Sequence, residues 1–372
     1  MARKLKTIIE LMELLAPQNY AMKWDNVGLQ IGTANQDINR ILVCLDINGE
    51  VINEAIEYDA NLIIAHHPMI FSPLKSIIKE DPKGKLIYRA IQNDINIYVA
   101  HTNMDIAPGG LNDLVADRIN LKNVKVLDST SVEKLYKIVV FAPLGFEEEI
   151  SDALIRGGAG HIGNYSHCTF RGEGIGTFKP LEETNPFIGH KGKVERTNEI
   201  RLETIVPSKH LNASITYMLQ VHPYEEVAYD VIPLENLGKE IGIGRVGELE
   251  KSTNLKEIVD MIKNCFNLKT VRVSGDLNKK IKRLAIVNGS GADYIEMAKN
   301  SGCDCLITGD VKYHDAQKAL ENDIAIVDAG HFETEIYFVD LVTDYLSKKF
   351  NNGKMDIEII KSNAGVNPFT LI

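Results

Sequence analysis

The stretch Asn61-Leu-Ile-Ile-Ala-His-His-Pro-Met-Ile-Phe71 joins an apolar run to two adjacent histidines, His66 and His67, followed by Pro68. Consecutive apolar residues are typical of a strand that is buried on both faces of a parallel sheet. Because proline cannot continue a β-ladder, we expect the histidines where this strand gives way to a loop. Binding sites of open α/β sheets lie at the carboxyl ends of strands. The pair is therefore a candidate metal site, with structural or surface histidines as the alternative.

The segments around this stretch predict alternating strands and helices. In the first third of the chain, strands and helices are expected in turn at residues 40–46, 50–58, 61–65, 85–93, 95–100 and 111–119. The last third repeats the strands and helices at residues 283–288, 292–300, 303–308, 313–321 and 324–328. Such alternation indicates an α/β fold with mainly parallel sheets covered by helices.

The two sets of elements share a feature that indicates an internal duplication. In each set the last strand ends in a histidine that an acid follows four residues later, His101 with Asp105 and His331 with Glu335. We infer duplicated βαβ-type sheets in two related halves that face one another within one metal-binding domain. The alternative is the general likeness of all α/β repeats.

Residues 130–240 differ from both halves in the order of their predicted strands and helices. They contain predicted strands at 136–143, 168–177 and 201–206, predicted helices at 146–156 and 209–221, and a glycine-rich segment at 157–165. A β-α-β-β-α-β order is typical of a ferredoxin-like domain. We therefore predict an α+β insert at 130–240, which interrupts an α/β domain made of residues 1–129 and 241–372.

The composition is that of an ordinary globular protein. With 372 residues, 44% hydrophobic and 25% charged, the chain is long enough for two domains. The formal net charge of −10 argues against nucleic acid and anionic membranes as partners. No apolar segment is long enough to span a bilayer, and residues 4–16 predict an amphipathic helix rather than a signal peptide. Five scattered cysteines are typical of reduced thiols in a cytoplasmic protein.

Imidazoles and carboxylates lie at or just past the predicted strand ends: His66, His67, His101, Asp105, Asp310, His314, His331 and Glu335. Mixed nitrogen and oxygen ligands suit zinc, iron or manganese. One tetrahedral ion cannot use so many groups, whereas two ions about 3.5–4 Å apart and bridged by a carboxylate could. Adjacent histidines suit such a site because each can serve a different ion. Scattered histidines without a metal are the alternative.

Several motifs resemble those of the GTP cyclohydrolase 1 type 2 homologues: Trp24–Gln30, Ala65–Pro68, His101–Asp105, Pro108–Asp113, Gly309–His314 and Asp328–Glu335. The resemblance implies a dinuclear metal centre and assembly as a toroidal homohexamer. It also implies that longer members carry a PII- or CutA-like insert, and His222–Glu226 resembles the end of this insert. It also implies the ligands of two divalent metal ions per subunit: His66, His67, Asp105, His331 and Glu335. Glu335 would bridge the ions, His67 and Asp105 would complete one, and His66 and His331 the other.

Two kinds of function are compatible with such a site. The first is a metal-dependent hydrolase that acts through metal-bound water. The resemblance implies ring opening of GTP with loss of formate, although other nucleotides and phosphoesters would suit the same metals. His101 and His314 would then be candidate acid/base residues, with structural roles as the alternative. The second function is a non-enzymatic metal store, sensor or scaffold. We expect further copies of the chain and a small-molecule substrate as partners.

Three other features receive structural interpretations. We predict that Trp24 anchors packing rather than stacking on a substrate. The segment Gly289-Ser-Gly-Ala292 is expected to form a tight turn rather than a phosphate site. Cys303 and Cys305 alternate along a strand and are expected to face opposite sides of the sheet.

Overall fold

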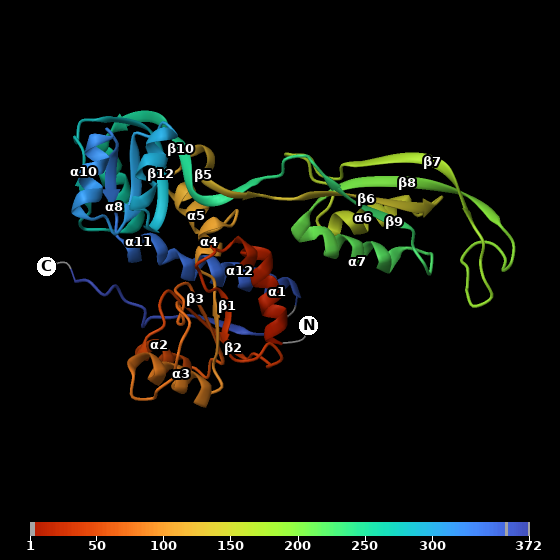
Figure 1. Cartoon of the computed structure of the whole chain (residues 1–372), viewed down its shortest axis with the longest axis horizontal. Helices are drawn as coiled ribbons and strands as arrows, with labels where there is room; N and C mark the ends of the chain where they lie inside the picture. Colours follow the sequence, from red (N-terminus) through yellow and green to blue (C-terminus); the bar gives the residue numbers. More distant parts are fainter. Residues whose placement is uncertain (1–3, 354–355, 371–372) are drawn as a thin grey trace. The chain divides into compact units, whose positions relative to one another are not determined.

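The computed structural model describes residues 4–353 and 356–370. The chain divides into two compact units, one formed by residues 1–130 and 241–372 and the other by residues 131–240. In Figure 1 the first unit is red to orange and cyan to blue, and the second is yellow to green. Within the described residues, no helix combines the length and apolar character needed to cross a membrane.

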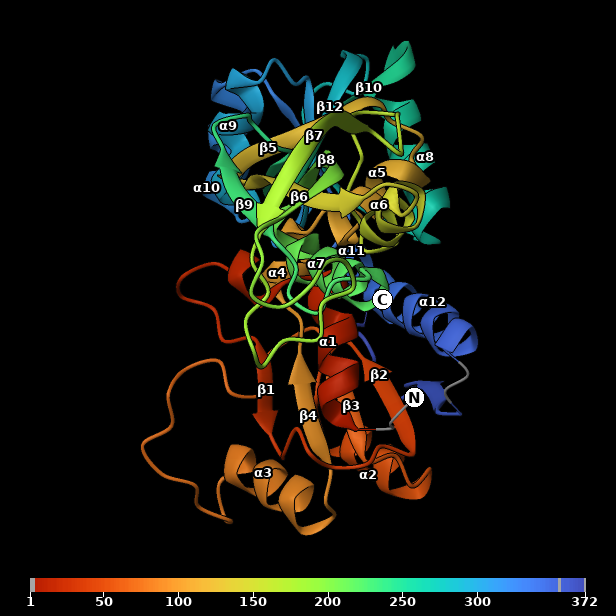
Figure 2. The same ribbon diagram turned by 90° about the vertical axis from the view of Figure 1, so that its right-hand side faces the viewer.

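The first unit contains a five-stranded sheet with the order β1-β4-β3-β2-β15. Its strands are β1 (Gly28–Ile31), β2 (Arg40–Cys44), β3 (Leu62–Ala65), β4 (Asn96–Val99) and β15 (Glu358–Lys361). All neighbouring strands are parallel except β1, which pairs antiparallel with β4. Figure 2 shows β1, β4, β3 and β2 side by side. Helices α1 (Leu5–Leu15) and α12 (Tyr337–Gly353) pack on one face, and α2 (Gly49–Glu57) and α3 (Pro82–Gln92) on the other.

The same unit contains a six-stranded sheet with the order β11-β14-β13-β12-β10-β5. Its strands are β5 (Lys122–Val132), β10 (Glu240–Asn254), β11 (Arg272–Ser274), β12 (Lys280–Ser290), β13 (Cys305–Gly309) and β14 (Ala325–Asp328). β12, β13 and β14 are parallel, while β11 and β10 pair antiparallel with β14 and β12. Helices α9 (Ile295–Asn300) and α10 (Tyr313–Glu321) pack on one face, and α5 (Leu111–Arg118) and α8 (Leu255–Phe266) on the other.

The two sheets repeat one topology. Strands β1-β4-β3-β2 and β11-β14-β13-β12 occur in the same order, each with an antiparallel strand beside the last parallel one. The last strand of each set leads into a single helical turn, α4 (Thr102–Ile106) after β4 and α11 (His331–Glu335) after β14. These turns place Asp105 and Glu335 four residues after His101 and His331 at the same stage of the two repeats.

The second unit has the element order β-α-β-β-α-β. Its elements are β6 (Leu135–Pro143), α6 (Glu147–Arg156), β7 (Thr169–Phe178), β8 (Glu195–Pro207), α7 (Leu211–Val221) and β9 (Tyr229–Leu234). The sheet order is β7-β8-β6-β9, and all neighbouring strands are antiparallel. Ile138, Val140 and Leu202 point to the face that α6 and α7 cover. Because side chains alternate along a strand, Phe141 and Arg201 belong to the opposite face.

The alternation of strands and helices predicted for both ends of the chain is confirmed. The strand β1, which begins at Gly28, lies in a segment for which the sequence predicted neither a strand nor a helix. Over residues 4–353 and 356–370 the fold also contains three short 3₁₀ turns: η1 (Gln18–Tyr20), η2 (Ser208–His210) and η3 (Ala292–Tyr294). Cys303 and Cys305 are both buried and belong to apolar clusters on opposite faces of the second sheet, as the alternation predicts.

Candidate metal centre

The carboxyl end of β3 positions His66 and His67. Their backbone N–H groups continue the pairing with β2, donating to the carbonyl oxygens of Cys44 at 3.3 Å and Leu45 at 2.9 Å. The fully buried His66 ring has its Nδ1 2.9 Å from the Ala100 carbonyl oxygen. A carbonyl can only accept, so this Nδ1 carries the proton. The Nε2 lone pair is therefore free and lies 3.7 Å from Glu335 Oε1 and 3.8 Å from Asp105 Oδ2.

Outer carboxylates orient the next two imidazoles. The His67 Nδ1 lies 2.8 Å from Asp46 Oδ1, and the His331 Nδ1 lies 2.7 Å from Asp310 Oδ2. A carboxylate on Nδ1 fixes the ring and directs Nε2 inward, which is the usual arrangement for metal-binding histidines. The two Nε2 atoms are 3.3 Å apart.

Glu335 lies at the centre of the cluster. One of its oxygens, Oε2, is 2.9 Å from His67 Nε2 and 3.0 Å from His331 Nε2, while Oε1 faces His66. Burial alone would raise the pKa of Glu335, but the nearby imidazoles of His331, His66 and His67 hold that pKa well below the usual range. Glu335 is therefore ionised, and its carboxylate contacts residues that both halves of the chain supply.

The remaining pKa shifts follow from burial and from Glu335. Burial and the negative charge of Glu335 raise the pKa of Asp105 well above its usual value. Burial lowers the pKa of His66. Burial also opposes protonation of His67 and His331, but their carboxylate partners outweigh it and raise the pKa to about 10 for His67 and to about 9 for His331.

Three overlapping groups of donor atoms could hold a metal ion: His67, His331 and Glu335; His66, Asp105 and Glu335; His66, His67 and His101. Within each group the donor atoms lie within 4.8 Å of one another. Three buried atoms of the cluster, His66 Nε2, Asp105 Oδ1 and Glu335 Oε2, have no hydrogen-bond partner among the described residues. Buried polar atoms are rarely left unpaired, so these orphans and the mixed imidazole and carboxylate donors fit a divalent metal ion.

His101 is built into the cluster in the same way as the other histidines. Its Nδ1 lies 2.9 Å from Asp25 Oδ1, and its ring centroid is 5.2 Å from that of His66. Asp25 also accepts hydrogen bonds from the backbone N–H and the hydroxyl of Thr102. These bonds lower the pKa of Asp25 although burial opposes them. Together they fix His101 at the start of α4.

Sequence reasoning missed two of these orienting carboxylates. Asp46 is the last residue of the predicted strand 40–46, at the same sheet edge as His66, so its position at a strand end could have indicated it. The position of Asp25 did not indicate such a role, because its segment precedes the first parallel strand. Asp310, a sequence candidate, contacts the cluster through His331. His314 does not join it: His314 is exposed on α10, and its Nδ1 pairs with Gln317 Oε1 at 2.9 Å.

The prediction that Trp24 anchors packing is wrong. Its side chain is 59% exposed, and its ring lies 5.7 Å from the half-exposed Phe71 and 6.2 Å from His101, centroid to centroid. The next residue, Asp25, points inward to His101. Trp24 and Phe71 therefore form an exposed aromatic pair beside the histidines.

The glycine turn at 289–291 does not offer a phosphate site. The backbone N–H groups of Gly289 and Gly291 donate to the hydroxyls of Thr334 at 3.0 Å and Thr308 at 2.8 Å. An added Cβ on Gly289 would lie 2.1 Å from Glu335 Oε1. This segment serves close packing against the cluster, as the tight-turn prediction requires.

Small-molecule sites usually have volumes of about 300–1,000 Å³. A cavity of about 720 Å³ opens beside the cluster. Asp46, His67, Asp310 and His331 line one part of it. Lys269 and Arg272 line another part, and Arg272 is held by hydrogen bonds to the Val311 carbonyl at 2.8 Å and to the Asp328 carboxylate. A small molecule could therefore reach the histidines.

These features define a class: a helix-covered α/β protein with twin sheets, a second α+β unit within the chain, and a buried histidine–carboxylate cluster that could bind a metal ion. The chain belongs to the Duf34/NIF3 (NGG1p interacting factor 3) family, whose model matches residues 3–368. The family resemblance noted from the motifs is thereby confirmed.

Relatives named "GTP cyclohydrolase 1 type 2 homolog" match nearly the whole chain. The protein from Halalkalibacterium halodurans is 45% identical over 99% of this chain and 98% of its own length. The Bacillus subtilis protein is 44% identical over 98% of each chain. Among solved structures, the Bacillus cereus protein related to NIF3 covers 100% of both chains with a TM-score of 0.89 and 42% identity.

Proposed function

We propose that this protein binds two divalent metal ions and acts as a metal-dependent hydrolase. His66, His67, Asp105, His331 and Glu335 would hold zinc, iron or manganese. The observation that carries the proposal is the Glu335 carboxylate, which belongs to two of the three donor groups and can serve both ions. Bound ions of this kind activate water and polarise the bond to be cleaved.

The residues around the proposed ligands would prepare the site. Asp46 and Asp310 hold the imidazoles of His67 and His331 with Nε2 directed inward. His101, held by Asp25 through its Nδ1, would be placed to exchange a proton at its Nε2 with a bound substrate. The exposed His314 remains a second acid/base candidate from the sequence, with weaker support because its hydrogen bond goes to Gln317.

A nucleotide is the substrate class that we propose. The relatives' name refers to GTP cyclohydrolase, and the cavity of about 720 Å³ is large enough for a nucleotide. Lys269 and Arg272 in its lining would suit phosphate groups. Ring opening of GTP and hydrolysis of another nucleotide or phosphoester are both compatible with this chemistry.

The second candidate function is a non-enzymatic metalloprotein scaffold, store or regulator, assembled as a toroidal homohexamer in the cytoplasm. The second unit favours this candidate. Its β-α-β-β-α-β order and antiparallel sheet support a ferredoxin-like, PII/CutA-like module of the kind that regulates other proteins. Sedimentation would test the hexamer.

Metal analysis with anomalous scattering tests the centre first. We expect two ions on the five proposed ligands, fewer ions in Glu335→Gln, and unchanged content in the control His190→Ala, whose side chain is 85% exposed. A single ion on surface histidines would contradict the proposal. Activity is then assayed with GTP and a panel of phosphoesters. Turnover that His331→Ala abolishes supports the hydrolase, whereas no turnover with any substrate leaves the scaffold.

A further inference from the structure

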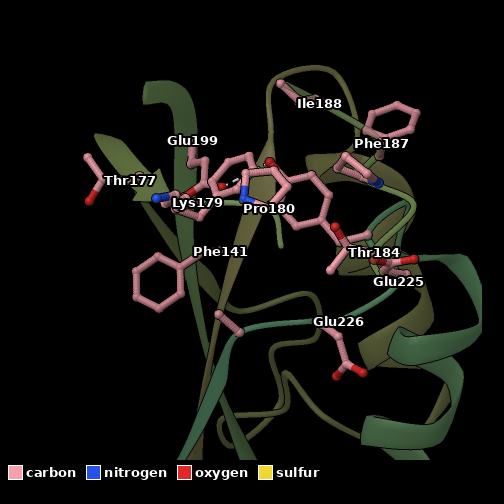
Figure 3. A pocket seen from close by; sticks show the side chains of 15 residues that line it. Phe141, Thr177, Lys179, Pro180, Thr184, Phe187, Ile188, Glu199, Glu225 and Glu226 are labelled. Atoms are coloured by element: carbon pink, nitrogen blue, oxygen red, sulfur yellow. Dashed lines mark hydrogen bonds between the residues drawn. The ribbon is translucent and has the colours of Figure 1, made fainter. Parts of the chain in front are cut away.

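The second unit contains a pocket of about 430 Å³ that the proposed metal chemistry does not use. This volume lies within the range of small-molecule sites. Its wall combines the ends of β6, β7 and β8 with the loop after β7 and the segment 224–228. Figure 3 shows the carboxylates of Glu199, Glu225 and Glu226 on different sides of the pocket.

Aromatic rings form much of the pocket wall. The Tyr224 ring centroid lies 6.4 Å from that of Phe178 and 6.3 Å from that of Phe187. Phe187 packs edge-on against Phe146 at 5.6 Å and remains 53% exposed. With Phe141, four aromatic residues line the cavity. The negative π-face of such rings attracts a cation, most strongly one that is weakly hydrated.

Acidic groups dominate the charge of the lining. Glu199, Glu225 and Glu226 face one cation of the described lining, Lys179. Glu199 is held in place because its Oε1 accepts a hydrogen bond from the Tyr224 hydroxyl at 2.9 Å. Glu226 is exposed and has no hydrogen-bond or ion-pair partner among the residues that the structure describes. A cationic ligand would therefore meet both aromatic faces and unneutralised carboxylates.

The pocket is built by the chain's own contacts. The Asn185 backbone N–H donates to both Glu225 oxygens, at 2.9 and 3.0 Å. The Gly192 N–H donates to the Pro180 carbonyl at 2.8 Å, which closes the loop after β7 on itself. Gly176 lets Glu199 lie against β7, since an added Cβ would be 2.0 Å from Glu199 Oε2. A preorganised wall reduces the entropy lost on binding.

We propose that this pocket binds a small organic cation, an ammonium group carried on an apolar body, through the rings of Phe178, Phe187 and Tyr224 and the carboxylates of Glu199 and Glu226. The site is separate from the histidine cluster in sequence and in chemistry. It gives the second unit a ligand of its own, and it stands whether or not the cluster proves to be catalytic.

The test uses full-length protein and a matched pair of probes, choline and its uncharged analogue 3,3-dimethyl-1-butanol, titrated by ligand-observed NMR. We expect saturable binding of choline and about tenfold weaker binding of the alcohol, since cation–π attraction is lost. Phe187→Ala should weaken choline about fivefold. Glu226→Gln should weaken it about threefold. Both positions are exposed, so neither variant threatens the fold.

Phe170→Ala and Glu173→Gln are the matched controls. Both residues are exposed on β7 of the same unit but do not line the pocket. Choline affinity should be unchanged in both. Equal affinity for choline and the alcohol would overturn the proposal, as would equal affinity in all four variants. Absence of saturable choline binding would also overturn it, including the case in which a second copy of the chain fills the pocket.

Discussion

At the level of single residues, the cluster is organised by what each imidazole does with its Nδ1. The Nδ1 atoms of His67, His101 and His331 each face an aspartate, and that of His66 faces a backbone carbonyl. The Nε2 atoms are thereby directed into the interior of the cluster, where they can act as metal ligands. The sequence could show that histidines end the strands. It could not show which aspartate pairs with which ring, because those pairs join residues up to 76 positions apart.

The raised pKa values of His67 and His331 predict proton release on metal binding. At about 10 and about 9, both imidazoles are protonated at neutral pH when no metal is bound. A metal needs the neutral ring, so binding at pH 7 should release about two protons, and metal affinity should rise with pH up to this range. Calorimetry in buffers of different ionisation enthalpy measures the release. A binding enthalpy independent of buffer would contradict the prediction.

The same shifts predict how the metal-free protein responds to pH. Folding raises both pKa values from 6.5, so the paired charges stabilise the fold fully below pH 6.5. This stabilisation is lost as the pH rises through about 9 and about 10. Denaturant titrations at pH 7 and above should therefore show a falling free energy of unfolding. Glu335→Gln, which removes the shared carboxylate, should flatten that dependence.

Trp24 predicts a direct optical signal for a nucleotide. Trp24 is the single tryptophan, and it lies exposed beside His101. All indole fluorescence of the protein therefore reports on the surroundings of His101. If a base stacks there, GTP should quench the emission while ribose 5-phosphate should not. Stacking is worth about 1–3 kcal/mol, so Trp24→Ala should weaken GTP about tenfold by calorimetry and Trp24→Phe much less. Equal quenching by ribose 5-phosphate would refute base stacking.

At the level of elements, buried parallel strands were the most predictable part. The apolar runs at β3 and β14 leave no alternative to burial on both faces, and both strands are fully buried. β1 was not foreseen because its four residues follow a segment of turn-forming composition and its pairing partner, β4, lies far along the chain. The acids four residues after His101 and His331 both lie on a single helical turn.

Gly289 tests how closely β12 must approach the cluster. Its φ is +63°, and a methyl group there would meet Glu335 Oε1. Gly289→Ala should therefore displace the carboxylate and lower metal affinity by about 10–100-fold. Gly302→Ala is the control, since Gly302 has a φ of +73° with nothing within 4 Å of an added Cβ. Equal metal affinity in the two variants, measured by competition with a chelator, would rule out this role for Gly289.

At the level of the whole molecule, the two topological repeats exchange helices. α5 follows the first repeat but packs on the second sheet, through Val115 and Ala116. α12 follows the second repeat but packs on the first sheet. This exchange brings α4 and α11, which precede the exchanged helices, into one cluster. The spacing within each repeat could be read from the sequence, whereas the exchange depends on packing between distant segments.

The exchange of helices predicts that the histidine–carboxylate cluster forms without the second unit. Thr130 and Ile241 are adjacent in the first unit, where the Thr130 hydroxyl donates to the Ile241 carbonyl at 3.1 Å. Deletion of residues 131–240, with a short glycine linker, should therefore leave a folded protein with the metal content of the full chain. Residues 1–130 alone, which lack His331 and Glu335, should bind far less metal. Loss of cooperative unfolding or of metal in the deletion variant would show instead that the second unit supports the centre. Retention of both would assign the centre to the twin sheets alone, because Glu335 then reaches His66 and His67 through the exchanged helices without help from residues 131–240.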